Sequence, residues 1–279
     1  MTLQTVTPAI PQRWITSAHT LNDFPESRNL AVQWACCEED ARQAQRLRYR
    51  VFATEMGAKL LPPTGRMPGI DIDAFDPFCD HLLVRAVSHR DDDDGQLVGT
   101  YRVLAPDAAR RAGGLYIDTE FDLTPLFGLR ARAVELGRFC VHPSWRSGGV
   151  IVALWSALCS YMQVHRLETM IGCASVGLND GGRSAAALWS RLRATHLVEP
   201  RWQVQPRIAL PLASDGGPAA AGEAGRMTSI PPLIKGYLRC GARLLGPPAL
   251  DNAFNTADLP MMLHLSELAP RYRKHFLGD

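Results

Sequence analysis

Lysine is almost absent from this chain of 279 residues. Lys59, Lys235 and Lys274 are lysines, and every other basic residue is an arginine. A large charge excess is absent as well, because 30 Lys and Arg stand against 28 Asp and Glu, a formal net charge of +2. A protein that binds nucleic acid needs a larger positive excess or a basic patch, so the composition argues against a nucleic-acid partner. The preference for arginine is typical of a GC-rich genome and also suits recognition of carboxylate and phosphate groups.

The usual motifs of zinc sites are missing too. The sequence contains no C-x-x-C pair and no H-x-x-x-H pair, which are common spacings of zinc ligands. The 7 cysteines are odd in number and irregularly spaced, and most lie in apolar segments. This pattern is typical of thiols in a reducing compartment rather than of a disulfide framework. We therefore expect no metal site.

No apolar run is long enough for a transmembrane helix. The longest, over 150–162, is interrupted by Ser156 and Ser160, and a bilayer span takes about 20 residues. Residues 1–11 have neither the basic patch nor the apolar segment of a signal peptide. The hydrophobic fraction of 46% is sufficient for a large core. We expect a globular, cytoplasmic protein.

Strand and helix patterns alternate along the chain, which predicts a mixed α/β fold. Periodicity and turn residues predict strands over 29–35, 81–88, 96–104, 134–141, 169–176, 203–210 and 258–265. They predict helices over 41–56, 150–166, 184–193 and 231–245. The sequence Asp91-Asp92-Asp93-Asp94-Gly95 is typical of a solvated hairpin turn.

Composition also predicts how the chain is organised. Residues 1–28 contain three prolines and no sustained periodicity, which indicates an irregular N-terminal arm. The core is expected over 29–212, followed by an Ala/Gly-rich flexible loop over 213–229. Residues 230–279 contain core-like apolar positions, so we expect an extension packed on the core.

The segment 135–149 is the most informative for chemistry. A strand ends at His142-Pro143, and a turn with Gly148 and Gly149 leads directly into an apolar helix. Glycines and the free N–H groups of a helix N-terminus can hold a phosphate group, although a simple strand-to-helix turn has the same pattern. Glu135 and Arg138 fall on opposite faces of a regular strand. If they share one cleft, the strand needs a bulge, which we expect at Gly137.

Cys140 and His142 stand two positions apart on this strand, on one face. A thiolate–imidazole pair for covalent catalysis would require that placement. The apolar surroundings of Cys140 argue against this alternative, because a buried cysteine is usually inert.

The joint order of several motifs resembles the acyl-homoserine lactone synthases. These motifs are Arg48-x-x-Val51-Phe52, Asp73-x-x-Asp76, His81, the segment 99–104 and Glu135-x-x-Arg138-Phe139. That family belongs to the GNAT acyltransferase superfamily. The resemblance implies a GNAT-like mixed central sheet flanked by helices, and an acyl group taken from acyl carrier protein.

Other segments depart from the lactone synthases and resemble the bacterial ornithine lipid acyltransferases. They cover 172–176, 231–239, 254–258 and 271–276. This second resemblance implies transfer of a 3-hydroxyacyl chain from acyl carrier protein to the α-amino group of L-ornithine, giving lyso-ornithine lipid. It implies no permanently bound cofactor, with acyl-phosphopantetheine as donor substrate. Ile151 stands where the superfamily usually has Gly or Ala, which is compatible with a carrier-protein arm in place of coenzyme A.

The resemblance also implies roles for single residues. It indicates Glu135 as the base and Arg138 as its catalytic partner, while a structural ion pair of Glu135 with Arg138 or Arg102 remains open. It implies substrate contacts by Arg48, Phe52, Asp73, Asp76, Arg102 and Ser175. It implies binding of the thioester and phosphopantetheine by Phe139, Cys140, Val141, Arg146, Gly148 and Gly149.

Two alternatives remain open. One is an acyltransferase for another amine, such as glycine, lysine or an adenosylmethionine-derived substrate. The other is a non-catalytic module whose basic segments, 42–50 and 271–274, bind acyl carrier protein or anionic lipid. The same segments suggest peripheral contact with the inner membrane surface.

Overall fold

The computed structural model describes residues 30–60, 69–87, 95–146, 148–211 and 229–277. The expected arm over 1–28, the acidic turn over 91–94 and the loop over 213–228 lie outside the described residues.

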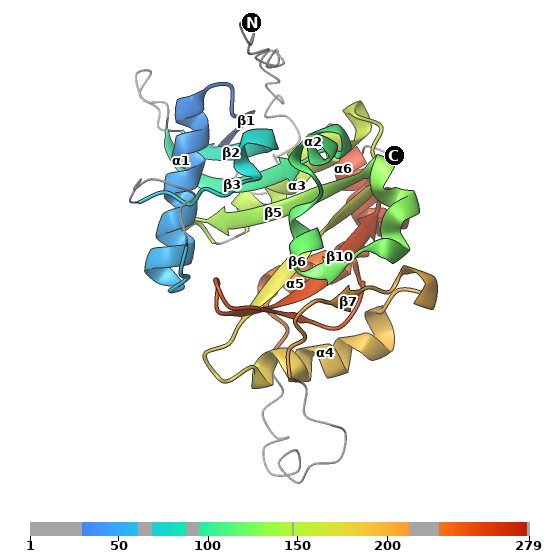
Figure 1. The fold of residues 1–279 in the computed structure, drawn as a ribbon. Coiled ribbons are helices and arrows are strands. Elements are labelled where there is room, and N and C mark those ends of the chain that lie inside the picture. Colours follow the sequence, from blue (N-terminus) through green and yellow to red (C-terminus); the bar gives the residue numbers. More distant parts are fainter. Residues whose placement is uncertain (1–29, 61–68, 88–94, 147, 212–228, 278–279) are drawn as a thin grey trace, which may run out of the picture.

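A mixed sheet forms the centre of the described fold (Figure 1). Its strand order is β1 (Leu30–Trp34), β2 (Asp80–Ala86), β3 (Gln96–Leu104), β5 (Ala133–Val141), β6 (Thr169–Gly177), β10 (Thr256–His264) and β8 (Arg243–Leu244), with β9 (Ala249–Asp251) also paired to β10. Neighbouring strands are antiparallel except β5 and β6, which are parallel. A separate two-stranded sheet joins β4 (Phe121–Asp122) to β7 (Gln205–Pro206). The expected α/β class with a GNAT-like mixed sheet is confirmed, and residues 230–279 supply β10 to the sheet itself.

Helices cover both faces of the sheet. One face packs against α3 (Gly149–Val164), α4 (Arg183–His196), α5 (Pro232–Cys240) and α6 (Pro270–Leu277), which share one hydrophobic core. The other face carries α1 (Glu38–Tyr49), which continues into a π-helical turn (Arg50–Glu55), and α2 (Pro106–Ala112). α3 is apolar around most of its circumference, because it is covered by the sheet on one side and by α6 on another.

Strand β5 carries the expected irregularity, one residue later than expected. Thr100 pairs with Cys140 and Arg102 pairs with Gly137, so Tyr101 opposes both Arg138 and Phe139. Arg138, rather than the glycine, takes the left-handed conformation, with φ of 50°. The bulge turns the Arg138 side chain to the face of Arg102, as ion pairs of both residues with Asp73 show. The prediction that the bulge lies at Gly137 was wrong. Arg138 can take the left-handed conformation because its ion pairs with Asp71 and Asp73 compensate the backbone strain.

The sheet opens between β5 and β6. The parallel ladder is three residue pairs long, and it joins residues 133–135 of β5 to residues 169–171 of β6. Past this ladder lies a cavity of about 40 Å³. Apolar and aromatic side chains from both sides of the opening line it, among them Tyr101, Leu136, Trp155, Cys173, Tyr237 and Met261.

Three sequence expectations differ from the structure. The strand expected over 203–210 is reduced to β7 and one isolated bridge at Ala209. The helix expected to reach Leu245 ends at Cys240, because Gly241 adopts φ of 112° and closes it. Residues 105–132, for which no element was expected, form α2 and two 3₁₀ segments, η5 (Tyr116–Thr119) and η6 (Thr124–Arg132), besides β4.

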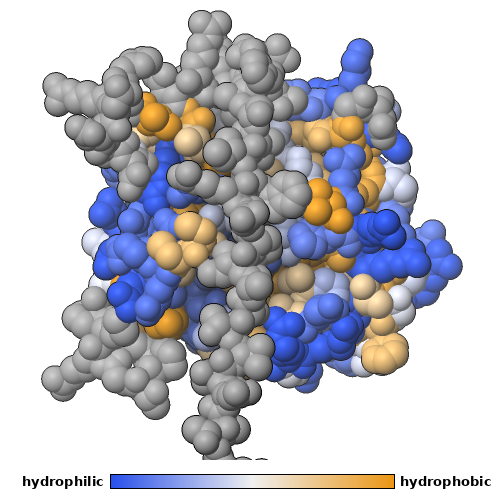
Figure 2. All heavy atoms as spheres, turned by 90° about the horizontal axis from the view of Figure 1, so that it is seen from above, coloured by the Kyte–Doolittle hydropathy of each residue, from blue (hydrophilic) through white to orange (hydrophobic). Residues whose placement is uncertain are grey.

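Seen from above, the described surface mixes hydrophilic side chains with separate hydrophobic patches (Figure 2). Among the described residues, no helix combines the length and apolar character needed to cross a membrane.

Gly172 keeps β5 and β6 close at the start of the opening. A Cβ at this position would lie 2.3 Å from the carbonyl oxygen of Leu136, a backbone atom that cannot move aside. We predict that Gly172→Ala destabilises the protein by about 1–3 kcal/mol, the usual cost of overpacking. Gly177→Ala, on the same strand with no atom within 4 Å, is the matched control. Equal melting temperatures of the two variants would contradict the prediction.

Candidate functional site

Arg48 is the buried centre of an ion network. It lies on α1 with 0% of its surface exposed. Its Nε donates to Asp71 Oδ2 at 2.8 Å, and its Nη2 donates to Asp76 Oδ2 at 2.9 Å and to the Asp71 carbonyl. A buried guanidinium is stable only when its charge and its donors are satisfied. The two aspartates therefore fix the segment after residue 69 against α1.

Arg102 and Arg138 extend this network to the sheet. Arg102 on β3 donates to Asp73 Oδ1 at 2.7 Å and to Asp76 Oδ2 at 3.3 Å. Arg138 donates to Asp73 Oδ2 at 2.9 Å, and its Nε lies 3.2 Å from Asp71 Oδ2. The two guanidinium groups hold the pKa of Asp73 at about 2, although burial opposes this. Three arginines and three aspartates thus compensate one another.

His81 borders the network as a neutral side chain. Its Nε2 lies 3.6 Å from Asp76 Oδ1. Burial, with the nearby charge of Arg48, lowers the pKa of His81 to about 4. The network therefore keeps its charge balance at neutral pH.

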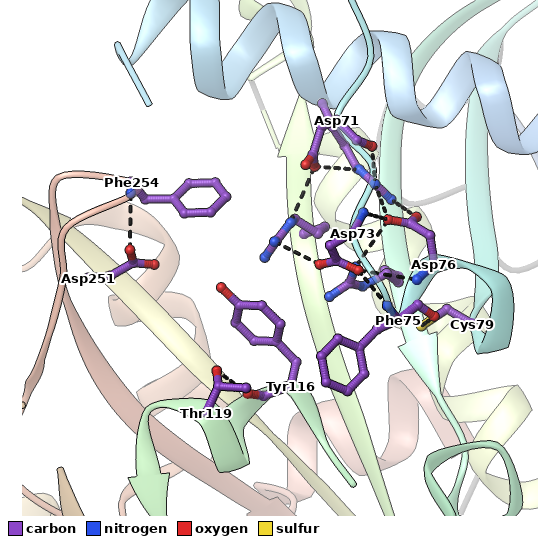
Figure 3. A network of polar contacts seen from close by, with 12 residues as sticks. Asp71, Asp73, Phe75, Asp76, Cys79, Tyr116, Thr119, Asp251 and Phe254 are labelled. Atoms are coloured by element: carbon purple, nitrogen blue, oxygen red, sulfur yellow. Dashed lines mark hydrogen bonds and ion pairs between the residues drawn. The ribbon is translucent and has the colours of Figure 1, made fainter. Parts of the chain in front are cut away.

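The guanidinium of Arg138 lies between two aromatic rings. Its carbon is 4.6 Å from the centroid of Tyr116 and 4.7 Å from that of Phe254. Figure 3 shows the Tyr116 ring between the Asp251–Phe254 turn and the aspartates of the network. The two rings come from distant segments, η5 and the β9–β10 turn. Cation–π contacts at both faces fix the guanidinium in place.

Glu135 accepts hydrogen bonds from backbone amides. Its Oε2 accepts from the N–H of Tyr116 at 2.7 Å, and its Oε1 accepts from the N–H of Ile117 at 2.8 Å. Burial raises the pKa of Glu135 to about 7, and these two bonds oppose the rise. The carboxylate therefore fixes η5, which carries Tyr116 beneath Arg138. No ion pair joins Glu135 to Arg102 or Arg138 in the described structure.

A second cluster has carboxyl groups without arginine partners. Glu120, Asp251 and Asp258 lie close to one another, and Cys173 lies beside Glu120 and Asp258. None of the three forms an ion pair within the described part of the chain. Burial and the neighbouring carboxylates raise the pKa of Glu120 to about 9, and mainly burial raises that of Asp258 to about 6. At neutral pH the Glu120–Asp258 pair therefore shares about one proton.

The geometry of this acidic cluster suits a positively charged group. The ligand atoms of Glu120, Cys173 and Asp258 lie within 4.8 Å of one another. Glu120 Oε1 is buried and accepts no hydrogen bond in the described structure. The thiol of Cys173 donates to Glu120 Oε2 at 3.4 Å, and its pKa is raised well above the ordinary value by burial. A cation with several N–H donors would satisfy these acceptors.

Ser175 and Phe52 lie at the edges of the site. Ser175 lies opposite Asp258 across the β6–β10 ladder, and its hydrogen bond lowers the Asp258 pKa against the effect of burial. Phe52 contacts Phe254 edge-on, with centroids 5.6 Å apart. Both predicted residues thus lie beside groups of the arginine network or the acidic cluster.

The residues expected near the thioester lie along β5 and the turn after it. Phe139 contacts the ring of Tyr101, with centroids 5.1 Å apart, and Val141 belongs to the core. Cys140 packs against Leu47 of α1 and Val51 of the π-helical turn that follows it, and burial raises its pKa to about 12. A protonated thiol packed against a helix does not suit the covalent alternative.

The turn before α3 is held by an arginine. Arg146 donates to both carboxylate oxygens of Glu55, at 2.6 and 2.7 Å, and to the carbonyl of Val141. Gly148 has φ of 119° and precedes Gly149, the first residue of α3. The N-terminus of α3 therefore lies close to the end of β5, as the sequence predicted.

Several residues of the site carried no sequence signal that we used. They are Asp71, Tyr116, Glu120 and Asp251. Phe254 and Asp258 belong to the segment 254–258 that carries the second resemblance, but no role was expected for either residue. Asp71 lies in the Pro- and Gly-rich segment just before the Asp73-x-x-Asp76 motif, Asp251 is an isolated acidic residue, and Tyr116 and Glu120 belong to the segment without an expected element. Only their tertiary contacts distinguish them from surface residues.

Comparisons with known proteins agree with this architecture. Residues 47–156 match the model of the acetyltransferase (GNAT) domain family. The chain is 38% identical over 259 residues to an L-ornithine N(alpha)-acyltransferase of Agrobacterium fabrum, covering 92% of this chain and 88% of the relative. It is 37% identical over 254 residues to a protein of the same name from Rhizobium meliloti, covering 90% and 85%.

Solved structures share the fold. The acyl-homoserine lactone synthase LasI has a TM-score of 0.50 at 15% identity, with 90% of this chain and 95% of LasI covered. FeeM, an N-acyl amino acid synthase from uncultured soil microbes, also has a TM-score of 0.50, at 10% identity, with 87% and 97% covered.

The acidic cluster predicts a pH-dependent stability. The folded protein keeps Glu120 protonated up to about pH 9, whereas an unfolded chain releases this proton near pH 4.5. The contribution of Glu120 to stability is therefore greatest below about pH 4.5 and falls as pH rises toward 9. Glu120→Gln cannot ionise, so the melting temperature of the wild type relative to this variant should fall by about 3 °C or more from pH 5 to pH 9.

The matched control is Glu199→Gln, an exposed glutamate beside Arg201. Its difference from the wild type should stay small at every pH. If the melting temperatures of the wild type and Glu120→Gln differ by the same amount at pH 5 and pH 9, Glu120 is ionised in the folded protein over this whole pH range.

Proposed function

Because this chain belongs to the family of the L-ornithine N(alpha)-acyltransferases, we propose that it transfers an acyl group from a thioester to the α-amino group of L-ornithine. The relatives that share about 90% of the chain carry this name, and the superfamily domain is an acyltransferase domain. Family membership is the observation that carries the proposal. The two charged clusters support it, because ornithine carries two amino groups and one carboxylate.

The acidic cluster is our proposed site for the ammonium groups of ornithine. Its three carboxyl groups lack arginine partners among the described residues, whereas the aspartates of the neighbouring network are compensated. The two ammonium groups of bound ornithine would favour ionisation of Glu120 and replace the proton it holds. Arg138 lies at the boundary of both clusters, since its charge also acts on Glu120. We propose that the ornithine carboxylate contacts this arginine.

The reaction needs one proton acceptor. The amine nitrogen forms a bond to the thioester carbonyl carbon, the carbon–sulfur bond breaks, and a proton from the nitrogen passes to the departing sulfur, so the products are an amide and a free thiol. The α-ammonium must first lose a proton. The buried Glu120–Asp258 pair shares about one proton at neutral pH, so one carboxylate of the pair is free to accept a second. We propose Asp258 as the group that receives this proton.

Glu135 then has a positioning role. Both of its oxygens accept hydrogen bonds from the backbone N–H groups of η5, whereas Asp258 Oδ1 accepts from a side chain, the hydroxyl of Thr256. A base must reach the proton it removes. The earlier hypothesis that Glu135 is the base remains a prediction, and the experiment below compares it with Asp258.

The donor side of the proposal uses the opening between β5 and β6. The apolar cavity there suits the start of an acyl chain. Cys173 lines this cavity and also contacts Glu120, so the donor and acceptor sites would meet at β6. The N–H groups after the bulge, at Phe139 to Val141, would polarise the thioester carbonyl. Gly148, Gly149 and Arg146 would hold the phosphopantetheine.

Three finer points follow from the resemblance and belong to the proposal. The donor is a 3-hydroxyacyl chain on acyl carrier protein, the product is lyso-ornithine lipid, and the enzyme works at the inner membrane surface without spanning it. The basic residues near Arg271 are the proposed contact with the acidic carrier protein or with anionic lipid.

The direct test is product analysis. Purified protein is incubated with 3-hydroxyacyl carrier protein and L-ornithine, glycine or lysine, and the products are identified by mass spectrometry. We expect acyl-ornithine as the main product. Acylation of glycine or lysine with no acyl-ornithine would overturn the acceptor. Binding of the carrier protein without turnover of any amine would overturn the enzymatic function.

Two variants separate the roles of the carboxylates. Asp258→Asn should lower kcat by about 100-fold or more, the usual contribution of a proton acceptor, with little loss of stability. Glu135→Gln should instead lower the melting temperature. Its side-chain amide group cannot accept a hydrogen bond, so one N–H of η5 is left without an acceptor, at a cost of about 1–3 kcal/mol. Asp107→Asn, on the exposed start of α2, is the control and should keep full activity. Full activity of Asp258→Asn, with loss of kcat and unchanged stability in Glu135→Gln, would assign the base to Glu135.

A further inference from the structure

Two tyrosine hydroxyl groups face each other beside the apolar cavity. Tyr101 on β3 and Tyr237 on α5 have their oxygens 2.7 Å apart. The residues are 4% and 9% exposed, and both line the cavity at the opening between β5 and β6. A polar pair in a wall that is otherwise mostly apolar calls for a physical explanation.

The pair leaves one hydrogen-bond donor unused. Two phenolic groups bring two O–H donors, and the contact between them uses one. Within the described part of the chain, neither oxygen has another hydrogen-bond partner. Burial raises the pKa of Tyr101 to about 12 and raises that of Tyr237 as well, so both protons are present at neutral pH. A buried donor without an acceptor costs about 1–3 kcal/mol.

The position of the pair relates it to the thioester end of the donor. Tyr101 is the residue that the β5 bulge opposes, and its ring contacts Phe139. Leu136 and Gly172 line the same cavity where β5 and β6 separate. A chain that enters this cavity from a carbonyl held at Phe139 to Val141 would have its first carbons nearest the pair, because Tyr101 lies opposite Phe139 in the ladder. A group on a distant part of the chain would not reach it.

We propose that the Tyr101–Tyr237 pair binds a hydroxyl group near the thioester end of the acyl chain and thereby selects hydroxylated donors over unsubstituted ones. This inference rests on the proposed acyl transfer to an amine. The free O–H of the pair donates to the substrate hydroxyl, and the substrate hydroxyl can donate back to a tyrosine oxygen. An unsubstituted chain would leave the donor unsatisfied and is rejected for that reason.

A competition assay tests this selectivity. Equal amounts of 3-hydroxyacyl and unsubstituted acyl carrier protein of one chain length are offered with excess L-ornithine, and mass spectrometry gives the product ratio. For the wild type we expect a preference of about 10-fold for the hydroxylated donor, the usual effect of one buried hydrogen bond. The preference should decrease in Tyr101→Phe and Tyr237→Phe and fall to about 1 in the double variant. The ratio compares two donors on the same molecules, so a loss of folded protein cancels.

Tyr161→Phe is the matched control. Tyr161 is also buried on the α3 face, at 8% exposure, but its hydroxyl donates to Asp80 at 2.8 Å and does not line the cavity. Its product ratio should equal that of the wild type. A structural role of the pair alone would change the melting temperature of the double variant and leave the ratio unchanged.

The outcomes separate this inference from the proposed function. A wild type that makes acyl-ornithine from both donors equally, or a double variant that keeps the wild-type ratio, overturns the inference and leaves the proposed acyl transfer to ornithine intact. If another amine is acylated in place of ornithine, the proposed acceptor is wrong. The preference between the two donors is then measured from the acylated products of that amine. A protein that acylates no amine with either donor contradicts both.

Discussion

The compensation of three buried arginines by three aspartates is the constraint on which the site depends. Arg48, Arg102 and Arg138 come from α1, β3 and β5, and all three aspartates come from the short segment 71–76. Removing one partner of such a buried network typically costs about 3–5 kcal/mol, because the other charge is left unpaired. The network therefore ties the helix, the sheet and an otherwise irregular segment to one geometry. It also explains why Arg138 holds a left-handed backbone conformation.

The acidic cluster beside this network has the opposite property. Glu120 and Asp258 are buried without countercharge among the described residues, so the folded protein holds a proton there at neutral pH. This arrangement weakens the unliganded protein as pH rises. In the proposed function, this lack of countercharge is what would bind the cationic acceptor, because a bound ammonium group would supply the missing positive charge. The proposal therefore links stability and recognition of the acceptor through the same carboxyl groups.

The separation of β5 from β6 brings the two halves of the proposed reaction together. Parallel pairing stops at Glu135 and Ile171, and the space beyond contains the apolar cavity with the tyrosine pair. Cys173 reaches from this cavity to the acidic cluster on the other face. An opening in the sheet is therefore the place where an apolar donor chain and a polar acceptor can meet.

The sequence by itself determined the α/β class, most strands and helices, and the ordered motifs around Arg48, Asp73, Arg102 and Arg138. Hydrophobic periodicity and turn residues are patterns among neighbouring residues, so they can be recognised in the sequence. The need for a bulge near Gly137 could also be inferred from the sequence, because side chains alternate along a strand and Glu135 and Arg138 would otherwise lie on opposite faces. The tertiary structure alone decided that Arg138 takes the bulge, that Glu135 binds the amides of η5, and that Glu120, Asp251 and Asp258 form one cluster. Those outcomes depend on burial and on contacts between distant segments, and local sequence patterns do not encode which segments meet.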